Sequence, residues 1–141
     1  MASIIITCAF FMLTQFTTFF EITSRAQEDN SKLIKFYNNL QQDLHGSKLV
    51  VKNGNEIVCQ FNNHKIIYQI DGDVLIRDFL EVKDSLITNE LEVKAGYVTT
   101  NKSNGILKDL YLNFNALEQD FSWGLHKTYG ASVYINNQEQ Q

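Results

Sequence analysis

Three histidines, two cysteines and an Asp-Gly-Asp triplet are the residues of this chain that could bind a metal ion or provide a nucleophile. A structural zinc site takes about four Cys or His ligands at characteristic short spacings. Here His45, His64 and His126 stand far apart, and Cys8 and Cys59 form no paired motif. Phosphate-binding glycine loops, metalloprotease helices and serine-hydrolase elbows are missing from the sequence. The sequence therefore predicts no catalytic, cofactor-binding or metal-binding residues, and we expect the protein not to be an enzyme.

Two acidic positions have more than one interpretation. The triplet Asp71–Asp73 resembles part of a calcium loop, but such loops need several further oxygen ligands at fixed spacings. A hairpin turn is therefore the favoured interpretation of this triplet. Asp43 stands between Leu40 and Leu44 on a predicted helix. Its carboxylate could pair with a basic residue such as Arg77, or it could be solvated.

Cys59 and Trp123 both lie in runs where apolar and polar residues alternate. Cys59 alternates with Ile57 and Phe61, which predicts a buried structural thiol. The run that holds Trp123, the only tryptophan, favours a core position over a ligand platform. His45 ends the predicted helix, where a cation is electrostatically favoured.

The composition is that of one globular domain, with or without a membrane segment. The chain has 141 residues, a formal net charge of −4 at pH 7 and 44% hydrophobic residues. That length is too short for two independent cores. The acidic balance argues against a general nucleic-acid binder, because such proteins carry a clustered basic face. Two cysteines are too few for a disulfide framework.

The N-terminal segment is apolar and carries no charge from Ala2 to Phe20. At about 1.5 Å per residue it spans roughly 28 Å, close to the ~30 Å hydrocarbon core of a bilayer. Three interpretations remain open: a retained single-pass membrane anchor, a secretory signal cleaved near Ser24–Ala26, and a buried core helix. As an anchor or filament core, the segment would use its large apolar side chains: Ile4, Ile5, Ile6, Phe10, Phe11, Leu13, Phe16, Phe19 and Phe20.

Apolar residues after this segment recur every three or four positions, which marks one face of a helix. The residues that we expect to pack on a sheet are Leu33, Phe36, Leu40 and Leu44. Gly46 stands where a helix C-terminus is expected. The sequence predicts one helix over residues 3–45, apolar in its first half and amphipathic in its second. The alternative is a break within residues 27–31, with Asn30 or Ser31 capping a second helix.

After the predicted helix the hydrophobic period changes from about 3.6 to 2, which is typical of strands. Turn signals such as Asn53-Gly54 separate the runs. The expected strands cover residues 48–52, 56–61, 64–70, 74–77, 86–87, 91–93, 95–99, 106–117, 121–127 and 129–135, with a loop at 102–105. The expected fold class is α+β, a long N-terminal helix packed on an antiparallel β-sheet. The expected segments are 1–20 (membrane or filament core), 21–46 (amphipathic half of the helix), 47–137 (sheet head) and 138–141 (frayed tail).

Four stretches of the chain carry a resemblance to a known family. They are FYNNLQQDL (36–44), KLVVKNGN (48–55), KIIYQIDGDVLIR (65–77) and KTYGASVYIN (127–136). Together with the layout of helix and sheet over nearly the whole chain, they resemble the type IV pilins and the pseudopilins of type II secretion. The first stretch resembles the end of the first helix in the larger minor pseudopilins and minor pilins, and the other three are similar to pseudopilin-like proteins of Bacteroidetes.

The resemblance implies a pilin-like fold and a structural role. The apolar half of the helix would anchor the subunit in the inner membrane and later pack in a filament core, with the head in the periplasm. The implied partners are membrane lipid, other pseudopilins or pilins and their assembly platform, and could include secreted cargo. No nucleic acid and no cofactor are expected. The alternative function is a membrane-tethered or secreted periplasmic binding or adhesion domain.

The chain departs from the N-terminal motif of that family, which is a leader ending in glycine, then phenylalanine, then a glutamate at the fifth mature position. The segment Phe16–Glu21 echoes this motif only superficially, because Gln15 precedes the phenylalanine and the glutamate comes one residue late. No residue here inherits the processing or glutamate role, and we expect the sequence to start late. Gln15 and Thr14 could each form a hydrogen bond inside a membrane.

Overall fold

The computed structural model describes residues 2–98 and 104–130. The chain divides into two compact units, residues 1–34 and residues 35–141. Each unit is described by itself below.

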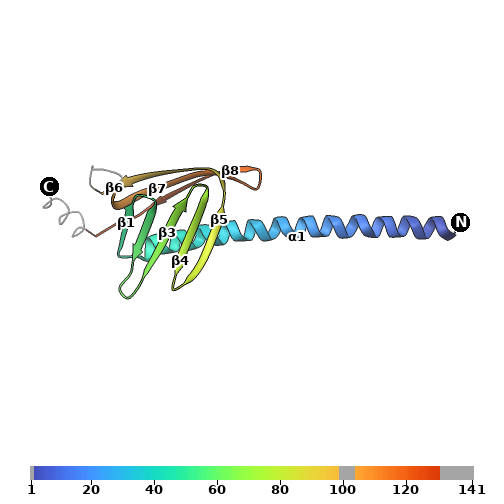
Figure 1. The fold of residues 1–141 in the computed structure, drawn as a ribbon, viewed down its shortest axis with the longest axis horizontal. Helices are drawn as coiled ribbons and strands as arrows, with labels where there is room; N and C mark the ends of the chain where they lie inside the picture. The colour runs from blue at the N-terminus through green and yellow to red at the C-terminus, as the bar shows by residue number, and fades with distance from the viewer. Residues whose placement is uncertain (1, 99–103, 131–141) are drawn as a thin grey trace. The chain divides into compact units, whose positions relative to one another are not determined.

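One helix, α1 (Ala2–Gly46), covers the N-terminal third of the chain without interruption (Figure 1). The sequence between its ends contains no proline or glycine, so nothing breaks its hydrogen-bond ladder. The predicted helix over residues 3–45 is confirmed, and the alternative break within residues 27–31 is not observed.

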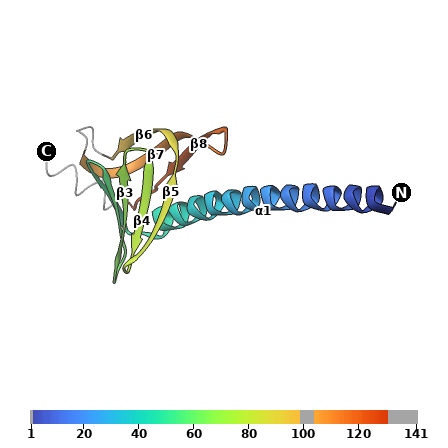
Figure 2. The same ribbon diagram turned by 45° about the vertical axis from the view of Figure 1, so that its right-hand side comes forward.

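The second unit contains an antiparallel sheet of eight strands within the described residues. The strands are β1 (Leu49–Asn53), β2 (Glu56–Gln60), β3 (Lys65–Asp71), β4 (Val74–Phe79), β5 (Val82–Ile87), β6 (Asn89–Tyr97), β7 (Asn104–Ala116) and β8 (Gln119–His126). Their order is β5-β4-β3-β2-β1-β7-β6, and β8 pairs with β7 beside this path. Only the ends of β1 and β7 pair, from Val51 with Ile106 to Asn53 with Asn104. Figure 2 shows that the sheet curls around this junction. The fold is therefore α+β, as the sequence predicts.

The first four expected strands correspond to β1–β4, which form the predicted meander. The triplet Asp71–Asp73 is a hairpin turn, with Gly72 at a φ of 59°. The runs at 91–93 and 95–99 are not separate strands within the described residues. Residues 91–93 and 95–97 belong to β6, which pairs with β7 without a shift of register from Glu92 to Gly96. Residue 99 lies outside the described residues. β7 already begins at Asn104, so the last two residues of the expected loop at 102–105 are strand, because they pair with β1.

The expected strand at 129–135 is wrong in its described part, because Tyr129 and Gly130 have no regular secondary structure. Tyr129 attaches to the sheet through its side chain instead. Its hydroxyl accepts a hydrogen bond from the Val50 N–H (3.2 Å) and donates one to the Leu107 carbonyl (2.6 Å). Residues 131–135 and the expected tail at 138–141 lie outside the described residues.

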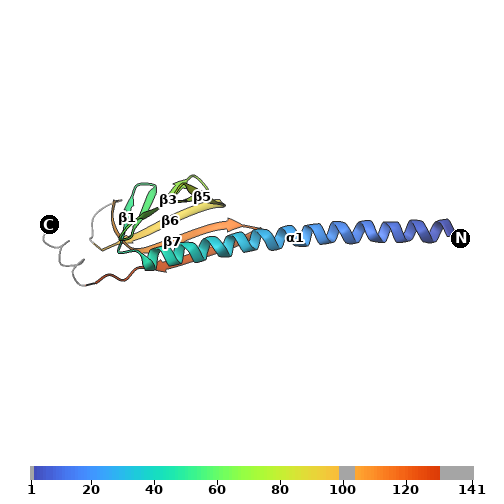
Figure 3. The same cartoon turned by 90° about the horizontal axis from the view of Figure 1, so that it is seen from below.

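The core of the second unit lies between the last turns of α1 and one face of the sheet (Figure 3). Phe36, Leu40 and Leu44 are each at most 4% exposed. Leu33, which belongs to the first unit, is 6% exposed. The Phe36 ring meets the edge of the Tyr68 ring, with 6.0 Å between the ring centroids. Burial of these side chains supplies the hydrophobic term that stabilises the unit.

Two hairpins turn through residues other than glycine in the left-handed region of φ. In the β4–β5 turn Leu80 and Glu81 have φ of 48° and 68°, and in the β7–β8 turn Leu117 and Glu118 have φ of 53° and 60°. L-residues pay roughly 1–2 kcal/mol for this conformation, whereas Asn-Gly adopts it readily. Both turns are therefore locally strained.

We expect the double substitution Leu117→Asn/Glu118→Gly to raise the free energy of unfolding by about 1–2 kcal/mol. The measurement is urea denaturation of the full chain in detergent, followed by the fluorescence of Trp123. As a control, Gly54→Ala places a Cβ at a φ of 56° and should lower stability by about 1 kcal/mol. A double variant less stable than the wild type would show that the turn is not strained.

Candidate functional site

The first unit presents an apolar surface that nothing in the described chain covers. The apolar window of α1 is 0% buried, and it is long and apolar enough to cross a membrane. A signal sequence near the N-terminus meets the same test by length and composition. The buried-core interpretation of this segment is wrong, because its large side chains are exposed to between 60% and 72%. The exposed side chains are Ile4, Ile5, Ile6, Phe10, Phe11, Met12, Leu13, Phe16, Phe19, Phe20 and Ile22.

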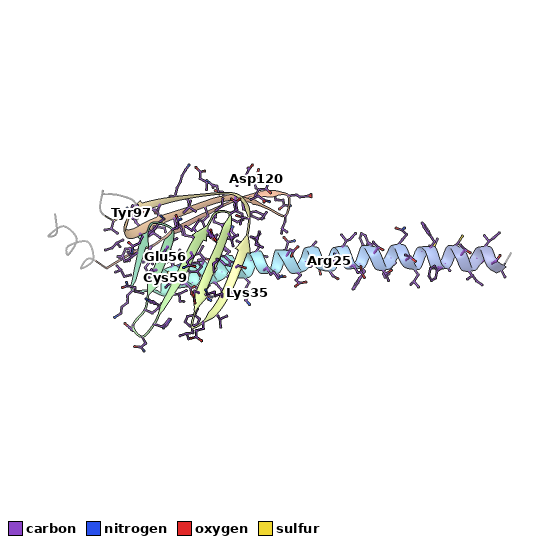
Figure 4. The ribbon with its side chains drawn as sticks, in the orientation of Figure 1. Arg25, Lys35, Glu56, Cys59, Tyr97 and Asp120 are labelled. Atoms are coloured by element: carbon purple, nitrogen blue, oxygen red, sulfur yellow. The ribbon has the colours of Figure 1, made fainter. Side chains whose placement is uncertain are left out.

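The threonine hydroxyls of this segment are satisfied inside the helix. Thr7, Thr14 and Thr18 each donate to the carbonyl four residues earlier, at 2.7–2.9 Å. A hydroxyl bonded in this way can enter a hydrocarbon environment at little cost. The threonines therefore make the segment effectively more apolar than its composition indicates. The first cation after it is Arg25, labelled in Figure 4.

In the second unit, a buried carboxylate joins α1 to the sheet. Asp43 is only 7% exposed. Its Oδ2 accepts hydrogen bonds from the Tyr68 hydroxyl (2.5 Å) and from Arg77 Nε (2.7 Å). Arg77 also lies 3.7 Å from Asp84 on β5. Of the two interpretations of Asp43, pairing with Arg77 is confirmed and solvation is wrong.

In this cluster the pKa values of Tyr68 and Arg77 are both raised. Burial, and then the hydrogen bond to Asp43, raise the pKa of Tyr68, so its hydroxyl remains a donor. The hydrogen bond to Asp43 also raises the pKa of Arg77. Burial raises the pKa of the nearby Cys59 thiol to about 12. Cys59, labelled in Figure 4, is 0% exposed, so the predicted buried thiol is confirmed and it is no nucleophile at neutral pH.

A second polar contact closes the C-terminal end of α1. Lys127 is 6% exposed, and its ammonium donates to the carbonyls of His45 (3.0 Å) and Ser47 (2.5 Å). Burial lowers the pKa of Lys127. The last carbonyls of a helix lack partners within the helix, and a cation there is favoured by the helix dipole. Lys127 thus caps the helix from a distant part of the chain.

The sequence did not identify Tyr68 or Lys127 as partners in these contacts. Tyr68 lies directly opposite Arg77 in the β3–β4 register, a long-range pairing that local patterns do not show. The sequence did contain a signal for Lys127. It stands two residues after Leu125 and four after Trp123, so it shares their face of the alternating pattern. A lysine in phase with core residues indicates a buried ammonium with specific acceptors.

The three histidines lie in different surroundings. His45 Nδ1 is 2.8 Å from the Gln41 carbonyl, His64 stacks on Phe61, and His126 Nδ1 is 2.5 Å from Asp109 Oδ1. Within residues 2–98 and 104–130, no three His, Cys, Asp or Glu side chains are close enough to hold a metal ion.

Trp123 is partly buried and packs in an aromatic group of the second unit. Its ring centroid lies 5.0 Å from that of Tyr37 and 4.8 Å from that of Phe114. These contacts are those of a packing residue, in line with the expected core position.

The strands β6, β7 and β8 form a shallow hollow of about 350 Å³. Its lining comprises Glu90, Glu92, Asn113, Phe114, Asn115, Asp120, Phe121 and Ser122. Two of the polar pairs are already bonded to each other, Asn115 to Asp120 and Ser122 to Asn113. Asp120 is labelled in Figure 4.

No protein-family model, no curated protein and no solved structure matches this chain.

We expect Arg77→Met to lower the free energy of unfolding by about 3–5 kcal/mol, because it leaves the Asp43 carboxylate buried and unpaired. Urea denaturation of the full chain in detergent measures this loss. The matched control is Lys83→Met, which removes an exposed pair with Asp78 (3.9 Å) and should cost at most about 1 kcal/mol. Asp43→Leu/Arg77→Met should recover most of the stability. If Arg77→Met and Lys83→Met had equal effects, the central role of the cluster would be contradicted.

The Cys59 thiol should resist alkylation by iodoacetamide at pH 8 until the protein unfolds, in a Cys8→Ser background. Its pKa rises from 9.0 to about 12 on folding. A raised pKa contributes stability that is present below pH 9 and is lost as the pH approaches 12. Mass spectrometry of the alkylated protein with and without urea tests this. Rapid labelling of the folded protein would contradict the burial of this thiol.

Proposed function

We propose that this protein is a minor pseudopilin-like structural subunit of a type II secretion or type IV pilus-type filament. Residues 2–20 hold it in the inner membrane as a single-pass anchor, and the β-rich unit lies in the periplasm as the head. The same apolar residues later pack against other subunits in the filament core. The subunit carries out no covalent chemistry, and its partners are lipid, other pilin-like subunits and their assembly platform.

One observation carries this proposal. A single unbroken helix is apolar and exposed in its first half, and in its last turns it supplies core residues to an antiparallel sheet. A helix of this kind can serve as a membrane anchor, and the same surface can pack on other helices after extraction. The four sequence stretches that resemble pseudopilins point in the same direction. In the described polar clusters, Asp43 bonds to Tyr68 and Arg77, and Lys127 bonds to a backbone carbonyl at the end of the helix. These contacts stabilise the head.

The second candidate is a membrane-tethered or secreted periplasmic binding or adhesion domain. The hollow on β6–β8 favours it, because the polar and aromatic side chains that line it could contact a ligand or a surface. In its secreted form the apolar segment would be a signal that is cleaved near Ser24–Ala26.

The test starts with the full chain expressed in its own cells. We expect it to remain in the membrane pellet after a carbonate wash, and mass spectrometry should find the apolar segment in the mature protein. Leu13→Asp should release a large part of it, because a charge near the centre of a span costs about 2.5–3.5 kcal/mol. Leu80→Asp is the matched control, since Leu80 is 71% exposed in the head unit. It should leave the protein in the pellet.

The filament role is tested separately, by deleting the gene and measuring secretion of extracellular proteins or pilus-dependent functions. Wild type should restore these functions and Leu13→Asp should not. A mature protein that starts at Gln27 would exclude the filament role and leave a secreted domain. Retention in the membrane without any effect on secretion or pili would favour the tethered binding domain.

A further inference from the structure

Gln15 differs from the other polar side chains in the middle of the apolar segment. Between Phe10 and Phe20 the polar side chains are three threonines and Gln15. The threonine hydroxyls donate to helix carbonyls, as Thr14 does to Phe10 and Thr18 does to Thr14. Within the part of the chain that the structure describes, the Gln15 amide has no hydrogen-bond partner. An unpaired amide in hydrocarbon costs several kcal/mol, which favours a partner from outside the helix.

The residues around Gln15 repeat at the spacing of a two-helix seam. Steps of four and three residues connect Ile4, Cys8, Phe11, Gln15, Thr18 and Ile22. At about 100° per residue, all of them lie within about 40° of one line along the helix. This alternation is the heptad spacing with which two parallel helices pack side by side. Its large apolar members Ile4, Phe11 and Ile22 are each at least 63% exposed.

We propose that two copies of this chain associate in the membrane as a parallel pair through this seam, with their Gln15 amides bonded to each other. The proposal rests on the membrane anchoring proposed above. It names a second copy because a two-fold parallel pair brings equivalent residues together. A primary amide both donates and accepts, so Gln15 is complementary to itself. The seam from Ile4 to Ile22 carries no charge, so the two copies do not repel each other there.

Cys8 makes this arrangement measurable with a native residue. It lies one heptad before Gln15 on the same seam, so in the pair it faces Cys8 of the second copy. Facing positions of this kind are within the range in which a disulfide can form. Cys59 is buried in the head and does not compete.

The experiment treats membranes that contain the full chain with copper phenanthroline. The two Cys8 thiols would give two protons and two electrons to the oxidant and form one disulfide, which is detected as a dimer on a non-reducing gel. We expect Gln15→Leu to lower the cross-linked fraction about threefold to tenfold, the range that interhelical hydrogen bonds produce. Gln15→Asn keeps an amide and should retain most of the dimer. Gln15→Leu also makes the segment more apolar, so its insertion is not at risk.

The matched control moves the thiol to the opposite face at a similar depth. In Cys8→Ser/Ile6→Cys the new thiol lies about 160° around the helix from position 8 and should not cross-link. Any of three results would overturn the seam. The thiol at position 6 could cross-link as much as Cys8 does, Gln15→Leu could cross-link as much as the wild type, or the wild type could give no dimer. In each of these cases retention after a carbonate wash leaves the anchor intact. If the wild type washes off, the membrane proposal itself fails and the seam fails with it.

Discussion

The buried carboxylate of Asp43 is the constraint on which the arrangement of the head depends. A charge that is only 7% exposed must be paired, and the partners, Tyr68 and Arg77, belong to neighbouring strands of the sheet. Turning the helix or sliding it by one residue would separate the charge from both partners. Leu40 and Leu44 flank Asp43 on the same helix, so their place in the core follows from the same contact. In this protein we infer that the cluster selects one packing of helix on sheet, a role of buried ion pairs that is established in some systems.

The helix and the first four strands could be predicted because their signals are local. The three- and four-residue spacing of Phe36, Leu40 and Leu44 defines the buried face, and tight-turn residues separate the strands of the meander. The same local approach failed in β6, which it divided into two runs although the pairing with β7 is regular from Glu92 to Gly96. It also failed at Tyr129, because a side-chain hydroxyl there replaces the backbone pairing of a strand.

The candidate site was predictable in its apolar part and in one of its ion pairs. The uncharged run from Ala2 to Phe20 can be read directly from the sequence. The sequence also offers Arg77 as a basic partner for Asp43. The third member of that cluster, Tyr68, depends on the β3–β4 register, which no local pattern determines. Among the described residues of the head, Asp43, Tyr68 and Arg77 bond to one another, and burial raises the pKa of the Cys59 thiol to about 12.

The contacts of Lys127 and Tyr129 have a consequence for the order in which the protein is made. Lys127 bonds to His45 and Ser47, about eighty positions earlier, and Tyr129 bonds across a similar distance to Val50. During synthesis the helix end and the first strand emerge long before the residues that close over them. These contacts of the head therefore form only after residues 127–129 have been made, and a polypeptide that stops before residue 127 lacks the cap on its helix. The helix cap is thus added only after β8 (Gln119–His126), the last described strand of the sheet, has been synthesised.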